Sequence, residues 1–368
     1  MKRYLILILF AIFFSSCGDN DKKINNIIEI EDDKEEEDGG GAEVAESQAY
    51  GADISWVTGM EKSGVKFYNE KGAETDCFAL IKEMGGNTIR LRVWVNPSTD
   101  VSNGMCDKTD VVAKSKRAAA LGMRLMIDFH YSDSWADPGK QNKPAAWKNH
   151  TLEQLKSDVA DHTTEVLEAI KAEGVDVEWV QIGNETKDGM LWDDGRCSTN
   201  PANYAALTKA GADAARNVYP NVKVIVHINN GWAYWTPEWI VDQLKAQGAH
   251  NAYDVIGVSY YPSTLSGEKD AELLNITTWQ DGNEAIASNA KNWVKKYNKK
   301  VMVVEFGYAN DKLKEAQECL SDLIDKTHDI EGFEGILMWE PECHKNWNGY
   351  GLGLFTSEGK PGVAFKGK

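Results

Sequence analysis

Eight short hydrophobic runs, separated by helical segments, predict that this chain of 368 residues folds as a single (β/α)8 barrel of the TIM type. The runs and helices lie between about residues 49 and 368, which is enough chain for one barrel of ordinary size. An open doubly wound sheet is the main alternative. It would usually carry a glycine-rich phosphate-binding turn after its first strand, and the segment DISWVTGMEKSG is not such a turn.

The predicted strands are rich in valine, isoleucine and aromatic residues, as expected of parallel strands that are buried on both faces. They cover residues 51–57, 88–95, 124–131, 178–185, 223–230, 254–261, 301–308 and 335–342. Amphipathic segments between them predict helices over residues 110–121, 152–172, 202–218, 237–247, 283–297 and 312–327. Strands and helices that alternate in this way favour a closed parallel barrel.

The first 17 residues predict export. Lys2 and Arg3 precede an apolar run up to Phe14, which is too short for a helix that spans a bilayer. Two serines then precede Cys17, an arrangement that resembles a bacterial lipobox. We therefore expect residues 1–17 to be a lipoprotein signal that ends at Cys17, the lipidated residue. The alternative is an ordinary signal peptide that is cut elsewhere, with an incidental cysteine.

Residues 18–48 are predicted to form a disordered acidic linker, because so few apolar residues cannot form a core. The segment carries 12 acidic residues and 3 lysines, a net charge of −9. The whole chain carries −17 and the signal +2, which leaves −10 for residues 49–368 and argues against nucleic acid as a partner. An acidic stretch after a lipidated cysteine resembles the surface-export signals of Bacteroidetes lipoproteins. A plain solvated spacer is the alternative.

Two glutamates end predicted strands at the same edge of the barrel. Glu185 ends the fourth strand, in VEWVQIGNE, and Glu305 ends the seventh, in KVMVVEFGY. Active sites of α/β barrels lie at these carboxyl-terminal strand ends. A pair of carboxyl groups there can break a glycosidic bond, one protonating the leaving oxygen and the other attacking the anomeric carbon. We assign Glu185 as the acid/base and Glu305 as the nucleophile, although an Asn-Glu pair alone would more often be a helix cap.

Further polar and aromatic residues at the same predicted strand ends are candidates for binding a substrate. Each also has a structural alternative: the histidines and tryptophans could be core residues, and Arg92 could neutralise a buried carboxylate or keep a glutamate ionised. The candidates are Arg92, Asp128, His130, Tyr131, Asp133, Trp135, Asn184, His227, Tyr260, Trp339 and Trp347.

Several segments resemble, in order along the chain, the family 53 glycoside hydrolases, which are endo-β-1,4-galactanases. They include GADISWV, TIRLRVWVNP, DFHYSDSWADPGKQNKPAAW, VQIGNET, DVIGVSYYP and VVEFGY. The resemblance implies a retaining enzyme with Glu185 as acid/base and Glu305 as nucleophile. It also implies β-1,4-galactan, a neutral side chain of pectin, as the substrate, with no cofactor. Together with the lipobox it predicts an outer-membrane protein that faces outward, with other polysaccharide-uptake proteins as partners.

The chain departs from this family after Glu305. Bacterial members often carry a long aspartate-rich loop there that binds calcium, whereas ANDKLKEAQ passes almost directly into a helix, so we expect no calcium at this place. Two alternatives to a galactanase stay open. One is a related retaining endo-glycanase that acts on mannan, xylan or β-glucan. The other is a surface lipoprotein that binds galactan without cutting it.

Overall fold

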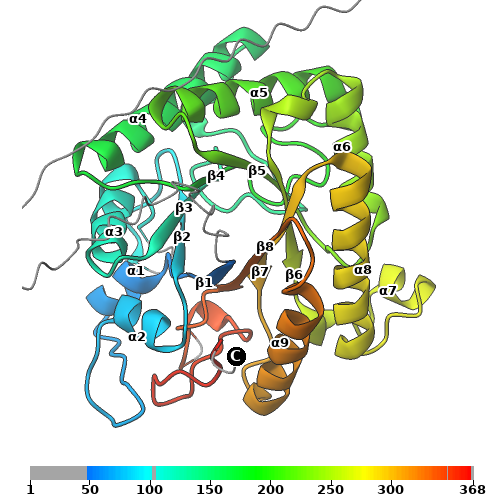
Figure 1. Ribbon diagram of the computed structural model, residues 1–368. Coiled ribbons are helices and arrows are strands. Elements are labelled where there is room, and N and C mark those ends of the chain that lie inside the picture. Colours follow the sequence, from blue (N-terminus) through cyan, green and yellow to red (C-terminus); the bar gives the residue numbers. More distant parts are fainter. Residues whose placement is uncertain (1–47, 102–104, 346, 366–368) are drawn as a thin grey trace, which may run out of the picture. The chain divides into compact units, whose positions relative to one another are not determined.

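The computed structural model describes residues 48–101, 105–345 and 347–365. The predicted signal, Cys17 and the linker up to residue 47 lie outside the described residues. Within those ranges the chain forms a closed barrel of eight parallel strands in the order β1 to β8, surrounded by helices (Figure 1). The predicted fold class is therefore confirmed. No helix of the described part has the length and apolar character needed to cross a membrane.

All eight predicted strands form, but most end a few residues earlier than expected. They are β1 (Ala49–Asp53), β2 (Thr88–Val93), β3 (Arg124–Phe129), β4 (Trp179–Ile182), β5 (Lys223–Ile228), β6 (Val255–Tyr260), β7 (Lys300–Phe306) and β8 (Phe333–Trp339). The polar residues that end the predicted runs leave the strand ladder and form the loops at the barrel mouth. Because these polar residues directly continue the hydrophobic runs in the sequence, the sequence pattern alone places the strand ends too late.

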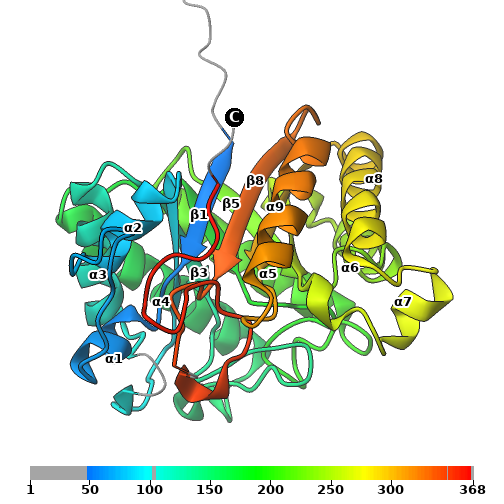
Figure 2. The same ribbon diagram turned by 90° about the horizontal axis from the view of Figure 1, so that it is seen from below.

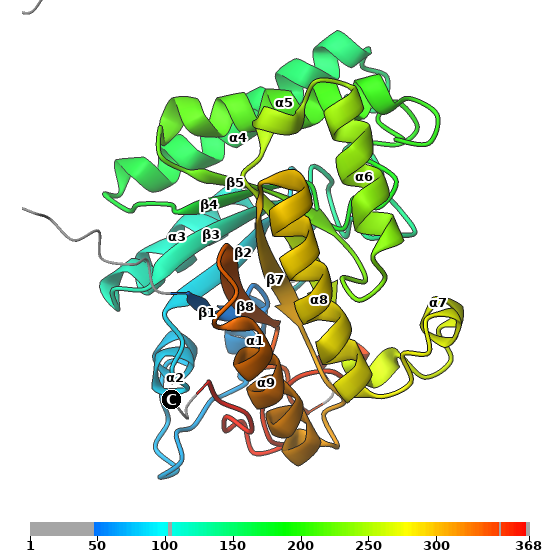
Figure 3. The same ribbon diagram turned by 45° about the vertical axis from the view of Figure 1, so that its right-hand side comes forward.

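The six predicted helices also form, with ends within a few residues of the predictions. They are α3 (Lys108–Ala120), α4 (Leu152–Ala172), α5 (Pro201–Val218), α6 (Trp235–Ala246), α8 (Trp279–Tyr297) and α9 (Leu313–Thr327). α8 begins four residues earlier than predicted because Thr278 and Asp281 form a capping box. Figure 3 shows α8 and α9 side by side along β7 and β8.

Three short helices were not predicted: α1 (Val57–Lys62), α2 (Cys77–Glu83) and α7 (Lys269–Leu273). α1 and α2 connect β1 to β2, and Figure 2 shows them beside the first strands. Each spans at most seven residues, too few for the periodic apolar pattern on which the other predictions rested.

The interior of the barrel has an apolar floor and a polar mouth. The floor consists of Ala49, Met126, Trp179, Ile225, Val255, Met302, Val304 and Leu337, all fully buried. Side chains an even number of residues apart in a regular strand point to the same face, so inward residues two or four positions after the floor residues lie nearer the mouth. They include Asp53, Asp128, Gln181, His227, Ser259 and Trp339. The change from floor to mouth within one strand positions the candidate site.

Candidate active site

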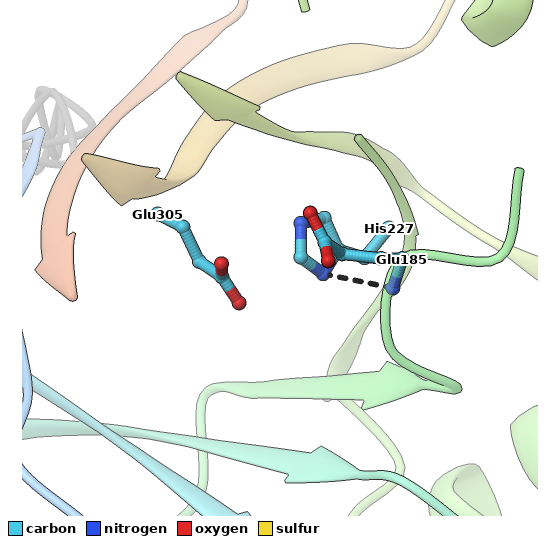
Figure 4. Close-up of side chains that lie close together, drawn as sticks. All are labelled: Glu185, His227 and Glu305. Atoms are coloured by element: carbon cyan, nitrogen blue, oxygen red, sulfur yellow. Dashed lines mark hydrogen bonds between the residues drawn. The ribbon is translucent and has the colours of Figure 1, made fainter. Parts of the chain in front are cut away.

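The two predicted catalytic glutamates meet at the mouth of the barrel (Figure 4). Glu185 is the third residue after β4, and Glu305 lies in β7. One carboxylate oxygen of each and a ring nitrogen of His227 all lie within 4.8 Å of one another. Glu185 is partly exposed and Glu305 is 4% exposed. A single ligand at the mouth can therefore contact both carboxyl groups.

Two irregularities of the backbone turn these glutamates toward each other. In the pairing of β6 with β7, Val258 is opposite Val303, but Ser259 is opposite Glu305, so Val304 is an extra residue. This bulge lets Glu305 point inward even though its neighbour Val304 already packs in the barrel floor. Glu185 has a positive φ of 46°, which redirects the chain directly after β4.

Arg90 is the charge partner of Glu305. Its guanidinium lies 3.0 Å from a Glu305 oxygen and 2.8 Å from oxygens of both Asp53 and Asp128, and all of these side chains are buried. Arg92, the arginine that the sequence offers for this role, is not the partner of Glu305. Both arginines belong to β2 and alternate with outward residues, so the strand pattern places them on one face but does not tell which one reaches the nucleophile.

The pKa values of the two glutamates differ in the direction that a retaining glycosidase requires. Burial raises the pKa of Glu185, the charge of Glu305 raises it further, and a hydrogen bond from Ser259 lowers it. Burial also raises the pKa of Glu305, but Arg90 and a hydrogen bond from Tyr261 act against this rise. Glu185 therefore holds its proton to higher pH than Glu305 does. This order suits an acid beside an ionised nucleophile.

Tyr261, rather than the predicted Tyr260, belongs to the site. The Tyr261 hydroxyl donates a hydrogen bond of 2.7 Å to Glu305. Tyr260 is fully buried and points outward, where its hydroxyl donates to the backbone oxygen of Trp279 at the start of α8. The prediction of Tyr260 as a substrate contact is wrong. The alternation of β6 could have shown this, because Tyr261 and the inward Ser259 are two residues apart.

The predictions of Arg92 and Tyr131 as substrate contacts are also wrong. Arg92 is fully buried in an ion pair with Glu340, and its guanidinium carbon lies 4.4 Å from the ring centre of Trp135. It therefore neutralises a buried carboxylate, which was the structural alternative. Tyr131 is fully buried outside the barrel, where its hydroxyl lies 2.7 Å from that of Thr163 in α4. Neither residue can contact a substrate in this arrangement.

Three further predicted contacts lie beneath the catalytic carboxylates and have protein partners. Asp128 is fully buried and pairs with Arg90 and with His130 at 3.0 Å. His130 also accepts a hydrogen bond from the backbone of Ala136, and His227 is fully buried among polar neighbours. Asp128 and His227 are fully buried and cannot reach a substrate in this arrangement, whereas contact of His130, which is 3% exposed, with a substrate stays a prediction.

Asn184 and Asp133 remain predictions as substrate contacts. Asn184 is 5% exposed, and its amide accepts from Arg90 at 3.0 Å and donates to the backbone of Ala136 at 2.8 Å. Asp133 is partly exposed and accepts hydrogen bonds from the backbones of Asn96 and Ala145. Both therefore hold neighbouring loops in this structure.

An aromatic pocket opens beside the catalytic pair. Its volume is about 480 Å³, and it is lined by Trp56, Trp135, Trp339, Asn348, Gly349 and Tyr350. Trp135 and Trp339 line this pocket, and their contact with a substrate stays a prediction. Trp347 is partly buried, packs against the core and does not line this pocket. Trp56 was missed because it lies within the first predicted strand, whereas in the structure it is the N-cap of α1, and Tyr350 was missed because it follows β8 in a loop whose course the strand pattern does not predict.

Two groups of described residues bring three metal-ligating atoms together: the catalytic group with His227, and Glu340, Glu342 and Cys343. The calcium site that bacterial family members carry after β7 does not fit this chain. The six residues between β7 and α9 contain a single carboxylate, Asp311, which is too few hard ligands for calcium. We derive no chemical step through a metal.

The second group is better explained by a proton. Glu342 is fully buried, and apart from its own backbone N–H no N–H or hydroxyl group of the described residues donates a hydrogen bond to its oxygens. Burial and the adjacent charge of Glu340 raise the pKa of Glu342 well above its usual value. A neutral acid that donates to Glu340 satisfies both groups, whereas two buried anions would repel each other. Glu340 itself holds Arg92 and the backbone N–H of Trp56.

Replacing Glu342 by glutamine should leave stability nearly unchanged at pH 5 and raise it at neutral pH, because the acid must take up a proton when the chain folds above the pKa of its unfolded state and the amide need not. The proton on Glu342 stabilises the fold at low pH, and this contribution is lost as pH rises toward the raised pKa of the folded state. The melting temperature of the wild type should therefore fall relative to that of Glu342→Gln as pH rises. Thermal unfolding between pH 5 and pH 9 measures this difference.

Glu340→Gln is the matched control. It leaves the buried Arg92 without its carboxylate, so it should lower the free energy of unfolding by about 3–5 kcal/mol at pH 7. Equal destabilisation by the two substitutions at pH 7 would show that Glu342 is charged and would contradict the neutral-acid interpretation.

Comparisons with known proteins agree with this site. Residues 49–353 match the family model described as glycosyl hydrolase family 53. The chain is 33% identical to a probable arabinogalactan endo-β-1,4-galactanase A of Neosartorya fischeri over 328 residues, covering 82% of this chain and 86% of that protein. It is 35% identical to the endo-β-1,4-galactanase of Bacillus subtilis over 262 residues, covering 70% of this chain and 56% of that protein.

Solved structures are similar over most of the barrel. A fungal β-1,4-galactanase superposes with a TM-score of 0.75 at 27% identity, covering 86% of this chain and 97% of that one. The GH53 catalytic domain of Ignisphaera aggregans gives a TM-score of 0.71 at 27% identity, covering 86% and 92%. On the match to its family model and these relatives, the chain belongs to glycoside hydrolase family 53.

Proposed function

We propose that this protein is a retaining endo-β-1,4-galactanase that hydrolyses galactan, the side chain of type I arabinogalactan in pectin. The observation that carries the mechanism is the separation of the two glutamates, whose nearest carboxylate oxygens lie within 4.8 Å. Retaining enzymes hold the carboxyl groups about 5–5.5 Å apart, whereas inverting enzymes need a wider gap for a water molecule. The galactanases among the relatives support the substrate.

In the first half of the reaction, Glu305 attacks the anomeric carbon while Glu185 gives its proton to the leaving oxygen. Arg90 and Tyr261 favour the ionised form of Glu305 beforehand through contacts of 3.0 and 2.7 Å. The product is a glycosyl ester on Glu305 and a carboxylate on Glu185. In the second half, Glu185 takes a proton from water as the water oxygen attacks the same carbon and Glu305 leaves as a carboxylate.

The aromatic pocket supports a carbohydrate ligand. Trp56, Trp135 and Trp339 pack against one another with ring centres 5.3–5.8 Å apart: Trp135 meets the other two rings edge to face, and the rings of Trp56 and Trp339 are tilted. Such rings present apolar surface to the C–H faces of a sugar while its hydroxyl groups stay in water. The negative charge of the domain suits a neutral polymer rather than an acidic one.

Product analysis after incubation with linear galactan, mannan, xylan and β-glucan tests the substrate. Short galacto-oligosaccharides from galactan alone are the expected result. Glu305→Gln should lower kcat by at least about 10³-fold while galactan binding is retained, since it removes the nucleophile at almost constant shape. Hydrolysis of another polymer would overturn the substrate, and undiminished turnover by this variant would overturn the assigned nucleophile.

Tyr261→Phe should lower kcat/KM by about 10- to 100-fold, because a hydrogen bond to a charged group is worth about 1.5–3 kcal/mol. The lost hydrogen bond also raises the pKa of Glu305, which must be ionised to attack. The acidic limb of the profile of kcat/KM against pH should therefore move to higher pH. The neighbouring Tyr260→Phe is the matched control, since it loses a hydrogen bond outside the barrel and should leave the profile unchanged. Equal profiles for the two variants would contradict this role.

We also propose that the enzyme is tethered by lipid at Cys17 in the outer membrane, facing outward, with residues 18–48 as the linker to the catalytic domain of residues 49–368. The lipobox-like start and the acidic segment support this proposal, as does a polymer substrate that must be cut before uptake. Other polysaccharide-uptake proteins are then its natural partners.

The full-length chain should incorporate labelled fatty acid and be removed from intact cells by an added protease. Cys17→Ser should abolish the label, whereas Cys77→Ser, which changes a buried cysteine of the barrel, should not. Labelling that survives Cys17→Ser would contradict the lipid anchor. Protection of the wild type from protease in intact cells would contradict an outward orientation.

A further inference from the structure

Ser259 lies between the two catalytic carboxyl groups. It is the inward residue of β6 opposite Glu305 and is 1% exposed. Its hydroxyl oxygen lies 2.8 Å from Glu185 Oε1 and 3.5 Å from Glu305 Oε2. By these distances its strong hydrogen bond is to the acid/base, and its contact with the nucleophile is weak. The hydroxyl is not needed to explain the fold, because it caps no helix and joins no loop.

His227 sets the direction of this hydrogen bond. Its Nδ1 accepts the backbone N–H of Glu185 at 3.3 Å, so the ring proton resides on Nε2. The amide nitrogen Nε2 of Gln181, which can only donate, lies 3.1 Å from the same Nδ1, so two donors face this nitrogen against one acceptor, Asn184 Oδ1 at 3.0 Å. Nε2 lies 2.8 Å from the Ser259 oxygen and therefore donates to it. The hydroxyl proton of Ser259 is then left for a carboxylate.

His227 stays neutral in this arrangement. Burial lowers its pKa well below the usual value, and the nearby charges of Arg90 and His130 lower it further. Because the ring is neutral and its tautomer is fixed, the two hydrogen bonds point the same way: His227 donates to Ser259, and Ser259 donates to Glu185. These hydrogen bonds stabilise Glu185 when that residue is a carboxylate and stabilise its protonated form much less.

We propose that Ser259, oriented by His227, is the positioning residue that stabilises Glu185 as a carboxylate in the second half of the double displacement. This inference rests on the proposed retaining mechanism. In that half-reaction the water oxygen bonds to the anomeric carbon, the bond from that carbon to Glu305 breaks, and Glu185 must be ionised to accept the water proton.

Glu185 needs this help because its surroundings favour the protonated form. The charged groups that face it are Glu305 and Asp137, which raise its pKa, and Arg90, which lowers it. Esterification of Glu305 removes one of the two negative charges, but burial still disfavours the carboxylate. Ser259 is the neutral group that lowers the pKa of Glu185, through the hydrogen bond that its hydroxyl donates.

Three substitutions of Ser259 test the proposal. Ser259→Ala removes the hydroxyl, Ser259→Cys replaces it with a weak donor, and Ser259→Thr keeps it as the control. The substrate is an aryl β-glycoside of β-1,4-galactobiose with an activated leaving group, whose first step needs no acid. We expect kcat to fall at least 10-fold in the alanine and cysteine variants, with KM lowered in proportion and kcat/KM within about threefold of the wild type. Azide, which attacks without losing a proton, should restore kcat. The threonine variant should resemble the wild type.

The profile of kcat/KM against pH on galactan gives a second readout. Loss of the Ser259 hydrogen bond raises the pKa of Glu185, which must be protonated in the first step, so the alkaline limb should move to higher pH. Equal loss of kcat and kcat/KM without azide rescue, in variants that unfold at the wild-type temperature, would overturn the proposal. A wild type that hydrolyses no galactoside would instead overturn the proposed function, so the two failures are distinguishable.

Discussion

The buried guanidinium of Arg90 is the interaction on which the rest of the site depends. It joins its own strand β2 to three others, because it pairs at once with Asp53 of β1, Asp128 of β3 and Glu305 of β7. A buried charge of either sign is costly unless it is paired and hydrogen-bonded, so each of these carboxylates needs the arginine as much as it needs them. The same contacts align the oxygens of Glu305 toward the mouth.

The mouth nevertheless contains more carboxyl groups than arginine side chains to pair with them. Two buried arginines face six carboxyl groups, which are Asp53, Asp128, Glu185, Glu305, Glu340 and Glu342. Protons and hydrogen-bond donors must balance the remainder in a region of low dielectric. Burial raises the pKa values of Glu185, Glu305, Glu340 and Glu342, but Arg90 and Arg92 act against this rise at Glu305 and Glu340. Glu342 has no arginine beside it, and Arg90 is a minor influence on Glu185, so these two residues are the ones that hold protons most readily.

The sequence was sufficient to predict the barrel, its eight strands, its six longer helices and the meeting of Glu185 and Glu305 at the mouth, because the elements and the strand ends depend on patterns that extend over many residues. The errors concern single residues. Tyr260 was chosen over Tyr261, although the inward position of Ser259 follows from the same period of two. For Arg90 and Arg92 no such rule exists, since both point inward and only the three-dimensional arrangement decides which one meets Glu305.

Glu305 shows the limit of the strand pattern most clearly. In a regular strand the inward Val304 would turn Glu305 outward toward the helices, where a carboxylate has no function. The bulge between β6 and β7 reverses this orientation and at the same time sets Ser259 opposite Glu305. A local break in the ladder thus brings together the nucleophile and the hydroxyl that reaches the acid/base. The fully buried floor, formed by residues such as Met126, Trp179 and Leu337, supplies packing energy that offsets this irregularity and the crowded charges above it.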